Sequence, residues 1–249
     1  MENTRLTKKN FMTDVAIVLA GGLGTRLQSV VKDVPKPMAE VAGRPFLNYL
    51  MYFLSTNNIK KVILAVGYKY EIIKEYLEIP ENRYGLEISY SIETEMLGTG
   101  GAIFKAYEQV EGDSSFILNG DTFFDISLSD LEAFARSNSA DLAFALLETE
   151  HSSRYGSVGC APNGKILSFK EKSAIENQKM IINGGIYYMN KSLISAITMP
   201  AKFSMEQDFF EKNLHRLKAY GKVYQALFID IGIPSDYYLS QKLLKNIIV

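Results

Sequence analysis

The pattern of apolar and polar positions divides the chain into two parts. Up to residue 147, short runs rich in Val, Ile and Leu alternate with longer segments whose apolar residues recur at helical spacing. The runs predict strands at residues 15–19, 62–66, 87–91, 116–119 and 142–147. The segments predict helices at residues 26–31, 46–56, 70–77, 101–110 and 128–137, the last capped by Ser127 or Ser129. Such alternation is typical of an α/β fold with an open, mostly parallel, Rossmann-like sheet, helices on both faces and ligands at the strand carboxyl ends.

Beyond residue 147 the pattern changes to short strands separated by turn residues. Strands are expected at residues 157–161, 166–170 and 182–189, followed by a helix at residues 206–218. A strand at residues 223–228 and a helix at residues 235–247 close the chain. We therefore expect one domain over residues 15–249, with a larger part at 15–147 and a smaller mixed α+β lobe with the closing elements at 148–249. Residues 1–14 are expected to form a polar tail.

Composition narrows the function classes. With 249 residues, 47% hydrophobic and 22% charged, the chain is long enough to bury a single core. The balance of 27 Lys+Arg against 28 Asp+Glu offers no basic field for nucleic acid, so none is expected as a partner. No apolar run approaches the ~20 residues that span a bilayer, and no secretory signal is found, so no membrane association is expected. The lone Cys160 fits a reducing, cytoplasmic compartment.

The apolar carboxyl end at residues 243–249 leaves one question of assembly open. It is expected to be covered either by a second subunit, as in a homo-oligomer, or by the chain's own sheet.

Three glycines follow the first predicted strand directly, in residues 20–26 (AGGLGTR). A glycine-rich turn between a strand and a helix lets backbone N–H groups converge on an anion, which predicts a phosphate site. The spacing is not that of a P-loop, and Leu27 replaces the third glycine of a dinucleotide motif, which argues against a nicotinamide-dependent oxidoreductase. Arg26 and Lys36, the latter held between two prolines, are two cations near the turn that suit a substrate with several phosphates. Each cation alone would be interpreted as a solvated surface charge.

The turn at residues 20–26 followed by residues 35–37 (PKP) resembles the signature of the sugar-1-phosphate nucleotidylyltransferases. The order of later motifs continues the resemblance over nearly the whole chain. Residues 29–39 (SVVKDVPKPMA) and 43–46 (GRPF) most resemble the D-glycero-α-D-manno-heptose 1-phosphate guanylyltransferases. The resemblance implies a nucleotide-binding part at residues 15–147, a sugar-binding lobe in residues 148–249, and nucleotide-sugar synthesis for surface polysaccharides such as capsule or lipopolysaccharide.

Two aspartates end predicted strands, Asp121 in residues 119–121 (NGD) and Asp230 in residues 230–232 (DIG). Together they could hold one Mg²⁺, which typically takes one or two carboxylates and completes its shell with phosphate oxygens and water. The resemblance implies that residues at these two positions do so. The plainer alternative is that Asp121 forms a turn and Asp230 lies beside a helix cap.

The resemblance also implies a set of contact residues. For the nucleotide these are Leu19, Ala20, Gly21, Gly22, Gly24, Thr25, Glu93, Leu97, Gly98, Thr99 and Gly120. Within this set, residues 97–100 (LGTG) would pack on the base and ribose, because small residues let a flat ring approach the backbone, and Glu93 would bind the base edge. For the sugar the residues are Asn119, Tyr155, Gly156, Glu171, Asn183 and Gly184. Residues 93–101 form a second predicted glycine-rich turn, and the alternative for it is a plain loop that starts a helix.

The predicted reaction is in-line attack by a sugar 1-phosphate oxygen on the α-phosphorus of a nucleoside triphosphate, GTP by the resemblance, giving a nucleotide sugar and pyrophosphate. The residues expected to carry it are Arg26, Lys36, Asp121, Lys172 and Asp230. Many relatives have Lys-Pro where this chain has Lys172-Ser173, so this loop is expected to be less rigid. Alternative substrates are mannose, glucose or N-acetylglucosamine 1-phosphate with GTP, UTP, dTTP or CTP. A non-catalytic regulatory protein that binds nucleotide sugars is the alternative without turnover.

Overall fold

The first half of the molecule is a parallel sheet. The structure, a computed structural model, describes residues 12–22, 24–150, 155–170 and 179–248. Strand β1 (Val15–Leu19) pairs in parallel with β4 (Lys61–Val66) and with β6 (Ser114–Asn119), and β5 (Glu87–Ile92) continues the sheet beyond β4. The prediction of parallel strands in this half is confirmed.

Helices cover both faces of this sheet, which explains why its central strands β1 and β4 are buried over almost their full length. Along β1, Ala16 and Val18 belong to one buried cluster, whereas Val15 and Ile17 belong to the other. Side chains alternate between the faces of a strand, so each cluster marks one face. The first face carries α1 (Phe46–Thr56), α2 (Tyr70–Glu78) and α4 (Leu128–Ser137), and the second carries α3 (Gly98–Ala106) and η5 (Met205–Phe210).

Strand β11 (Met180–Asn190) joins the two halves of the sheet. It pairs antiparallel with β6 on one edge and with β8 (Leu142–Thr149) on the other, and β12 (Ala219–Tyr224) pairs in parallel with β8. Strand β8 therefore keeps the direction of β6, although β11 lies between them. The hairpin of β9 (Ser157–Cys160) and β10 (Ile166–Lys170) extends the sheet from β11.

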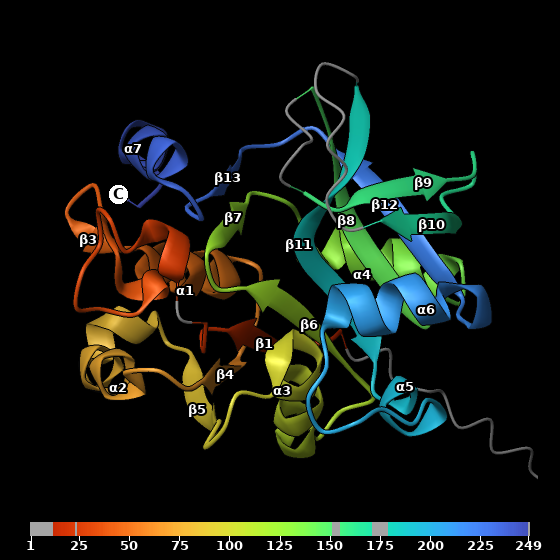
Figure 1. Cartoon of the computed structure of the whole chain (residues 1–249), viewed down its shortest axis with the longest axis horizontal. Helices are drawn as coiled ribbons and strands as arrows, with labels where there is room; N and C mark the ends of the chain where they lie inside the picture. The colour runs from red at the N-terminus through yellow and green to blue at the C-terminus, as the bar shows by residue number, and fades with distance from the viewer. Residues whose placement is uncertain (1–11, 23, 151–154, 171–178, 249) are drawn as a thin grey trace, which may run out of the picture.

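The end of the chain returns to the first half. Strand β13 (Phe228–Asp230) pairs antiparallel with β7 (Thr122–Phe124), directly after β6. Helix α7 (Pro234–Leu243) then packs on the small hairpin of β2 (Glu40–Val41) and β3 (Arg44–Pro45). Figure 1 shows α7 in blue next to β3 in orange, on the opposite side of the molecule from α5 and α6.

The chain itself covers much of the apolar carboxyl end. Leu244 is fully buried, and Ile247 and Ile248 pack against the same cluster as β1. Of the two alternatives for the apolar carboxyl end, cover by the chain itself therefore explains Leu244, Ile247 and Ile248.

Several predicted elements are correct in type but differ in their bounds. The helix expected at 101–110 begins at Gly98 and ends at Ala106, followed by the 3₁₀ turn η4 (Tyr107–Gln109). The helix expected at 206–218 is a π-type segment, η5, followed by α6 (Glu211–Asn213) and the 3₁₀ turn η6 (Leu214–Arg216). Helix α7 ends before the residue 247 that was expected.

The single strand predicted at 223–228 is wrong. The chain instead makes β12, which ends at Tyr224, and β13, which begins at Phe228, and the two strands belong to different sheets. Both pieces are short and apolar, so their pattern alone resembles one interrupted strand.

The remaining elements are short. They are η2 (Lys36–Met38), η3 (Pro80–Arg83) and α5 (Ser192–Ala196). In the parts of the chain that the structure describes, no helix has both the length and the apolar character to cross a membrane.

Candidate active site

The carboxyl ends of β1 and β6 open into a cavity of about 300 Å³, where a parallel sheet is expected to bind ligands. The predicted residues that line it are Leu19, Ala20, Gly21, Gly22, Gly24, Lys36, Glu93, Gly98, Thr99, Asn119, Gly120 and Asp121. Pro37, Met96, Ala102 and Glu206 complete the lining. The predicted site residues in this lining thus come from four separate segments, at residues 19–24, 36, 93–99 and 119–121.

The first glycine-rich turn borders the cavity without the helix that was predicted after it. Instead of a helix at 26–31, the chain makes only the 3₁₀ turn η1 (Thr25–Leu27). The β-branched Val30 and Val31 disfavour a helix, and Pro35 forces the residue before it into an extended conformation. The helix that was expected to follow the turn is therefore not formed, and the backbone N–H groups of the turn itself carry the phosphate-site prediction.

The three glycines of this turn have different surroundings. A Cβ on Gly21 would lie 2.7 Å from Glu93 Oε1, whereas one on Gly22 would meet no described atom within 4 Å. Gly24 adopts a φ of 61°, in the left-handed region. Arg26 follows on η1 with an exposed side chain, outside the cavity lining, and the side chain of Thr25 lies outside what the structure describes.

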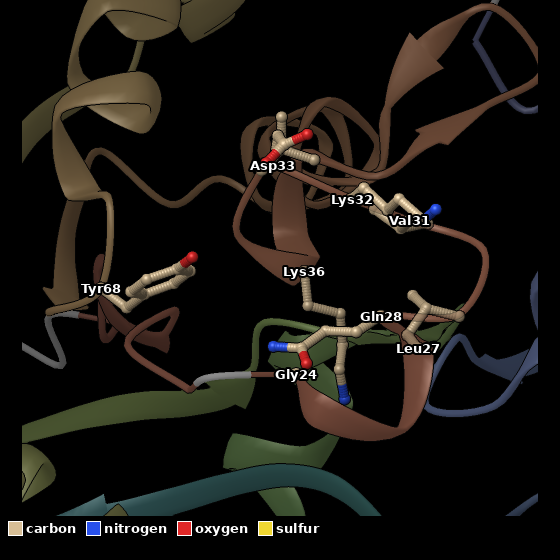
Figure 2. Close-up of a pocket in the computed structure, with 9 residues that line it drawn as sticks. Gly24, Leu27, Gln28, Val31, Lys32, Asp33, Lys36 and Tyr68 are labelled. Atoms are coloured by element: carbon tan, nitrogen blue, oxygen red, sulfur yellow. The ribbon is translucent and has the colours of Figure 1, made fainter.

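Lys36 and Asp121 meet at the floor of the cavity. The Lys36 Nζ atom lies 2.6 Å from Asp121 Oδ2, and the two side chains are 13% and 28% exposed. The Lys36 side chain passes directly beside Gly24, as Figure 2 shows, and a Cβ at Gly24 would lie 3.2 Å from Lys36 Cβ. The short, partly buried ion pair holds one predicted catalytic cation and one predicted metal ligand together.

A second hollow of about 300 Å³ lies on the other side of Lys36, between the loop at residues 24–36 and Tyr68 (Figure 2). Lys69, next to Tyr68, donates from Nζ to the Asp33 carbonyl oxygen at 2.9 Å. Both Lys69 and Asp33 have left-handed backbone angles, with φ of 52° and 63°. This contact connects the loop that carries Lys36 to the loop after β4.

Glu93 lines the cavity from the segment directly after β5. Its Oε2 atom accepts a hydrogen bond from Leu97 N at 3.1 Å. Burial raises the pKa of the Glu93 carboxyl above its usual range, and the Leu97 N–H and the nearby Lys105 charge oppose that rise. Leu97 therefore acts through its backbone, by holding Glu93.

The second glycine-rich turn packs against the aromatic ring of Phe203. A Cβ on Gly100 would lie 2.1 Å from the Phe203 ring, and one on Gly101 would lie 2.3 Å from the Ala201 carbonyl oxygen. Gly98 has a φ of 73° and borders the Phe203 carbonyl. A flat ring does approach the backbone of small residues here, but at Gly100 that ring is Phe203 and not the predicted nucleotide base. Gly98 and Thr99 also line the cavity.

The end of β6 needs a glycine because it runs very close to β1. Gly120 N donates to Leu19 O at 2.9 Å, and a Cβ on Gly120 would lie 2.2 Å from that oxygen. Asn119 directs its amide toward β11, where a Cβ on Gly185 would lie 2.9 Å from Asn119 Nδ2. This close approach positions Asp121 in the lining of the cavity.

Asp230 lies on the strand that pairs with the segment after Asp121. The register pairs Asp230 with Thr122, and Ile231 N donates to Asp121 O at 2.9 Å. Asp230 Oδ1 accepts from Gly232 N, and Asp230 is not among the residues that line the cavity. No group of three or more His, Cys, Asp or Glu gathers among the described residues. Two carboxylates on adjacent backbones still fit a Mg²⁺ ion, because this ion needs only one or two.

Of the residues predicted for the sugar, Asn119 lines this cavity, and the other described ones lie beyond it, around β11. Asn183 N donates to Gly156 O at 2.9 Å, and Asn183 Nδ2 donates to Tyr187 Oη at 2.6 Å. The Tyr155 ring contacts Phe228 edge to face, with the centroids 5.5 Å apart. Glu171 and Lys172 lie outside the described residues.

Packing explains both glycines that were predicted for the sugar, Gly156 and Gly184. A Cβ on Gly156 would lie 2.8 Å from the Phe169 ring, and one on Gly184 would lie 2.6 Å from the Phe124 ring. Their missing side chains therefore face aromatic rings of the chain itself.

A profile of the nucleotidyl transferase family matches residues 15–246. The chain belongs to this family. It is 45% identical to the D-glycero-α-D-manno-heptose 1-phosphate guanylyltransferase of Campylobacter jejuni, across 90% of this chain and 96% of that protein. It is also 45% identical to the protein of the same name from Aneurinibacillus thermoaerophilus, across 94% and 99%. The predicted resemblance is confirmed.

A solved structure gives the same result for the fold. HddC from Yersinia pseudotuberculosis superposes with a TM-score of 0.83 and 36% identity, over 94% of this chain and all of that one. Its complex with GMP-PN superposes with a TM-score of 0.82 and 35% identity.

One polar residue of this nucleotidyl transferase's cavity was missed in the sequence. Glu206 lines the cavity but lies in the first turn of a predicted helix, where acidic residues are common because they interact well with the helix dipole. Its contact with Thr99 joins residues 107 positions apart, which no local pattern indicates.

Proposed function

We propose that this nucleotidyl transferase joins GTP and D-glycero-α-D-manno-heptose 1-phosphate to give a GDP-heptose and pyrophosphate. The observation that carries the proposal is the cavity in which the first glycine-rich turn, Lys36 and Asp121 meet. The proposal is supported by two heptose 1-phosphate guanylyltransferases that are 45% identical over almost their full length. We place the reaction in the cytoplasm because nucleoside triphosphates are made there and Cys160 has no partner cysteine in the sequence.

The reaction needs alignment and charge neutralisation more than acid–base chemistry. An anionic oxygen of the sugar 1-phosphate attacks the α-phosphorus of GTP, and the bond from this phosphorus to the α,β-bridging oxygen breaks. Pyrophosphate leaves with the electron pair. In the proposal, backbone N–H groups of residues 21–25 and the Arg26 guanidinium hold the β- and γ-phosphates, and Lys36 guides the incoming phosphate.

Glu93 is the residue we propose to select the base. Guanine presents two adjacent N–H donors on its Watson–Crick edge, and an ionised carboxylate accepts from both. Leu97 N already orients Oε2, while Oε1 lies close to Gly21 at the cavity wall. Bases without this pair of donors would leave the half-buried carboxylate with only its hydrogen bond from Leu97 N, which is costly.

Asp121 and Asp230 are the residues we propose to hold Mg²⁺. When bound, the ion supplies a hard positive charge that neutralises phosphate oxygens. Asp121 would then exchange part of its interaction with Lys36 for the metal, which frees the Lys36 ammonium for a phosphate.

For the sugar we propose the segment around β11. Asn183, fixed between Gly156 O and Tyr187 Oη, borders the backbone of β9 and offers a rigid amide to a sugar hydroxyl. Tyr155, Gly156 and Gly184 shape this region, and Glu171 and Lys172 are proposed to bind sugar hydroxyls and the sugar's phosphate.

A substrate matrix tests the proposal. The purified protein is incubated with Mg²⁺, each of GTP, UTP, dTTP and CTP, and each of heptose, mannose, glucose and N-acetylglucosamine 1-phosphate. Nucleotide sugar and pyrophosphate are measured together. Turnover confined to GTP with the heptose phosphate supports the proposal, and turnover of another pair replaces the substrate while keeping the reaction. Tight nucleotide-sugar binding without any turnover contradicts it and favours a regulatory protein.

A further inference from the structure

Glu206 is a carboxylate at the cavity that the proposed reaction does not use. It lies in η5, on the second half of the chain, and is half-buried. Among the described residues that line the cavity, it is the one that follows Asp121 in the sequence. A second-half residue therefore reaches the site assembled from the first half.

Hydroxyl groups hold the Glu206 carboxylate in place. Its Oε2 atom accepts from Thr99 Oγ1 at 2.9 Å and from Ser204 Oγ at 3.2 Å. Thr99 Oγ1 in turn accepts from Met205 N at 2.8 Å, which fixes the Thr99 rotamer. The carboxylate is thus oriented before any ligand binds, and such preorganisation lowers the entropic cost of recognition.

The chemistry of the group indicates which part of a substrate it meets. A carboxylate repels phosphates, and the cation of the cavity, Lys36, is already paired with Asp121. An ionised carboxylate is instead a strong acceptor for hydroxyl groups. Glu206 therefore faces a neutral, hydroxyl-bearing part of a substrate.

Glu206 is linked to both predicted subsites. It contacts Thr99, which lines the cavity beside Gly98. Its negative charge also acts on Tyr187, because burial and, as a smaller effect, the Glu206 charge raise the pKa of Tyr187. Tyr187 is the hydrogen-bond partner of Asn183, the residue proposed for the sugar.

We infer that Glu206 is a specificity-determining residue that accepts a hydrogen bond from a sugar hydroxyl of the substrates. The hydroxyl belongs either to the ribose of the nucleotide or to the transferred sugar, and both have the same chemistry. The inference rests on the proposed function only in assuming that two such substrates are bound.

Glu206→Gln separates these sources. The substitution keeps the size of the side chain and removes its charge. Wild type, Glu206→Gln and the matched control Glu108→Gln, an exposed residue of η4, are compared with GTP, 2′-deoxy-GTP and 3′-deoxy-GTP, and with sugar 1-phosphates that have or lack single hydroxyls. KM, kcat and calorimetric affinity are measured for each, together with Tm.

We expect the KM for one substrate to rise about 10- to 100-fold with kcat little changed, because a hydrogen bond to a charged acceptor is lost. If this is the KM for GTP, and deoxy-GTP no longer distinguishes wild type from the variant, the hydroxyl is that of the ribose. If instead the KM for the sugar 1-phosphate rises, and the sugar phosphate that lacks one hydroxyl is equally poor for wild type and the variant, the hydroxyl belongs to the transferred sugar. Glu108→Gln is expected to match wild type.

A second variant tests the preorganisation. Thr99→Val removes one donor to Glu206 Oε2 and is expected to raise the same KM by a smaller factor. Overturning results are unchanged KM values for both substrates in Glu206→Gln, or a lowered Tm and kcat with both KM values kept. If the substrate matrix identifies a pair other than GTP and the heptose phosphate, the comparison is run on that pair, so the proposed function can fail while this inference is still tested.

Discussion

The two glycine-rich turns of this nucleotidyl transferase look alike in sequence and differ in structure. In the first, Gly22 has open space where its side chain would be, and the turn borders the cavity. In the second, Gly100 and Gly101 are pressed against Phe203 and Ala201. A ligand can therefore approach Gly22 of the first turn, whereas atoms of the protein itself already fill the space beside Gly100 and Gly101 of the second.

The comparison teaches that a glycine run does not by itself identify a ligand site. The second turn connects the two halves of the molecule through backbone hydrogen bonds. Gly100 N donates to Phe203 O, and Phe203 N donates to Leu97 O. Replacing glycines in the two turns should therefore separate binding from stability. The charges beside the first turn should show the largest effect on the reaction.

Asp121→Ala is expected to lower kcat/KM by at least ~100-fold, the usual scale for removing a preorganised charge from an active site. The loss also leaves the partly buried Lys36 ammonium without its 2.6 Å partner. Steady-state kinetics with the substrate pair from the matrix provide the measurement, and circular dichroism controls for folding. Turnover close to wild type would remove Asp121 from the proposed site.

Gly100→Ala is expected to destabilise the protein by about 1–3 kcal/mol, because the new methyl group overlaps the Phe203 ring and the packed core cannot give way easily. Denaturant unfolding measures the change. The double variant Gly100→Ala, Phe203→Leu should recover part of the loss relative to Phe203→Leu alone. An unchanged free energy of unfolding in the single variant would show that the second turn is not closed by Phe203.

Gly22→Ala is the counterpart in the first turn. Since its Cβ would meet no described atom within 4 Å, the free energy of unfolding should change by less than about 0.5 kcal/mol. The KM for the nucleotide should rise about tenfold, because one methyl group now occupies ligand space. A stability loss equal to that of Gly100→Ala would erase the contrast between the turns.

Glu93→Gln tests the role of the Glu93 carboxylate through the pH dependence of stability. The folded-state pKa of Glu93 is raised by burial, so the folded protein binds this proton more tightly than the unfolded chain, whose reference value is 4.5. Ionisation of Glu93 therefore lowers the free energy of unfolding. The loss grows as the pH rises from the pKa in the unfolded chain through the higher pKa in the folded protein. Glu93→Gln should gain stability relative to wild type from pH 4 to pH 8.

Activity should change with pH in the opposite direction. Guanine binding needs the ionised carboxylate, so wild-type kcat/KM for GTP should fall on the acid side at a higher pH than an ordinary glutamate would give. Glu93→Gln should be weak at every pH and lack this acid limb. An acid limb retained in the variant would assign it to another group.

Much of the first half was accessible from local pattern. The bounds of β1 and α1 were predicted correctly, because β1 is apolar on both faces and α1 is a long apolar segment that begins after Pro45 and ends before Asn57. Ser127, one of two predicted caps of α4, accepts from Asp130 N at 3.2 Å. The prediction of a helix after the first turn failed because Pro35 and the β-branched residues before it outweigh the short helical repeat.

The sequence by itself determined the strand ends that carry Gly21, Asn119 and Asp121, because parallel strands end at one edge and chemistry-bearing residues follow them directly. Only the tertiary structure decided that Phe203 fills the second glycine-rich turn, and that Glu206 joins Thr99 across 107 residues. Such contacts depend on where β11 and η5 fold back onto the first half. Side-chain packing between distant segments sets that path, and it leaves no periodic signal in the sequence.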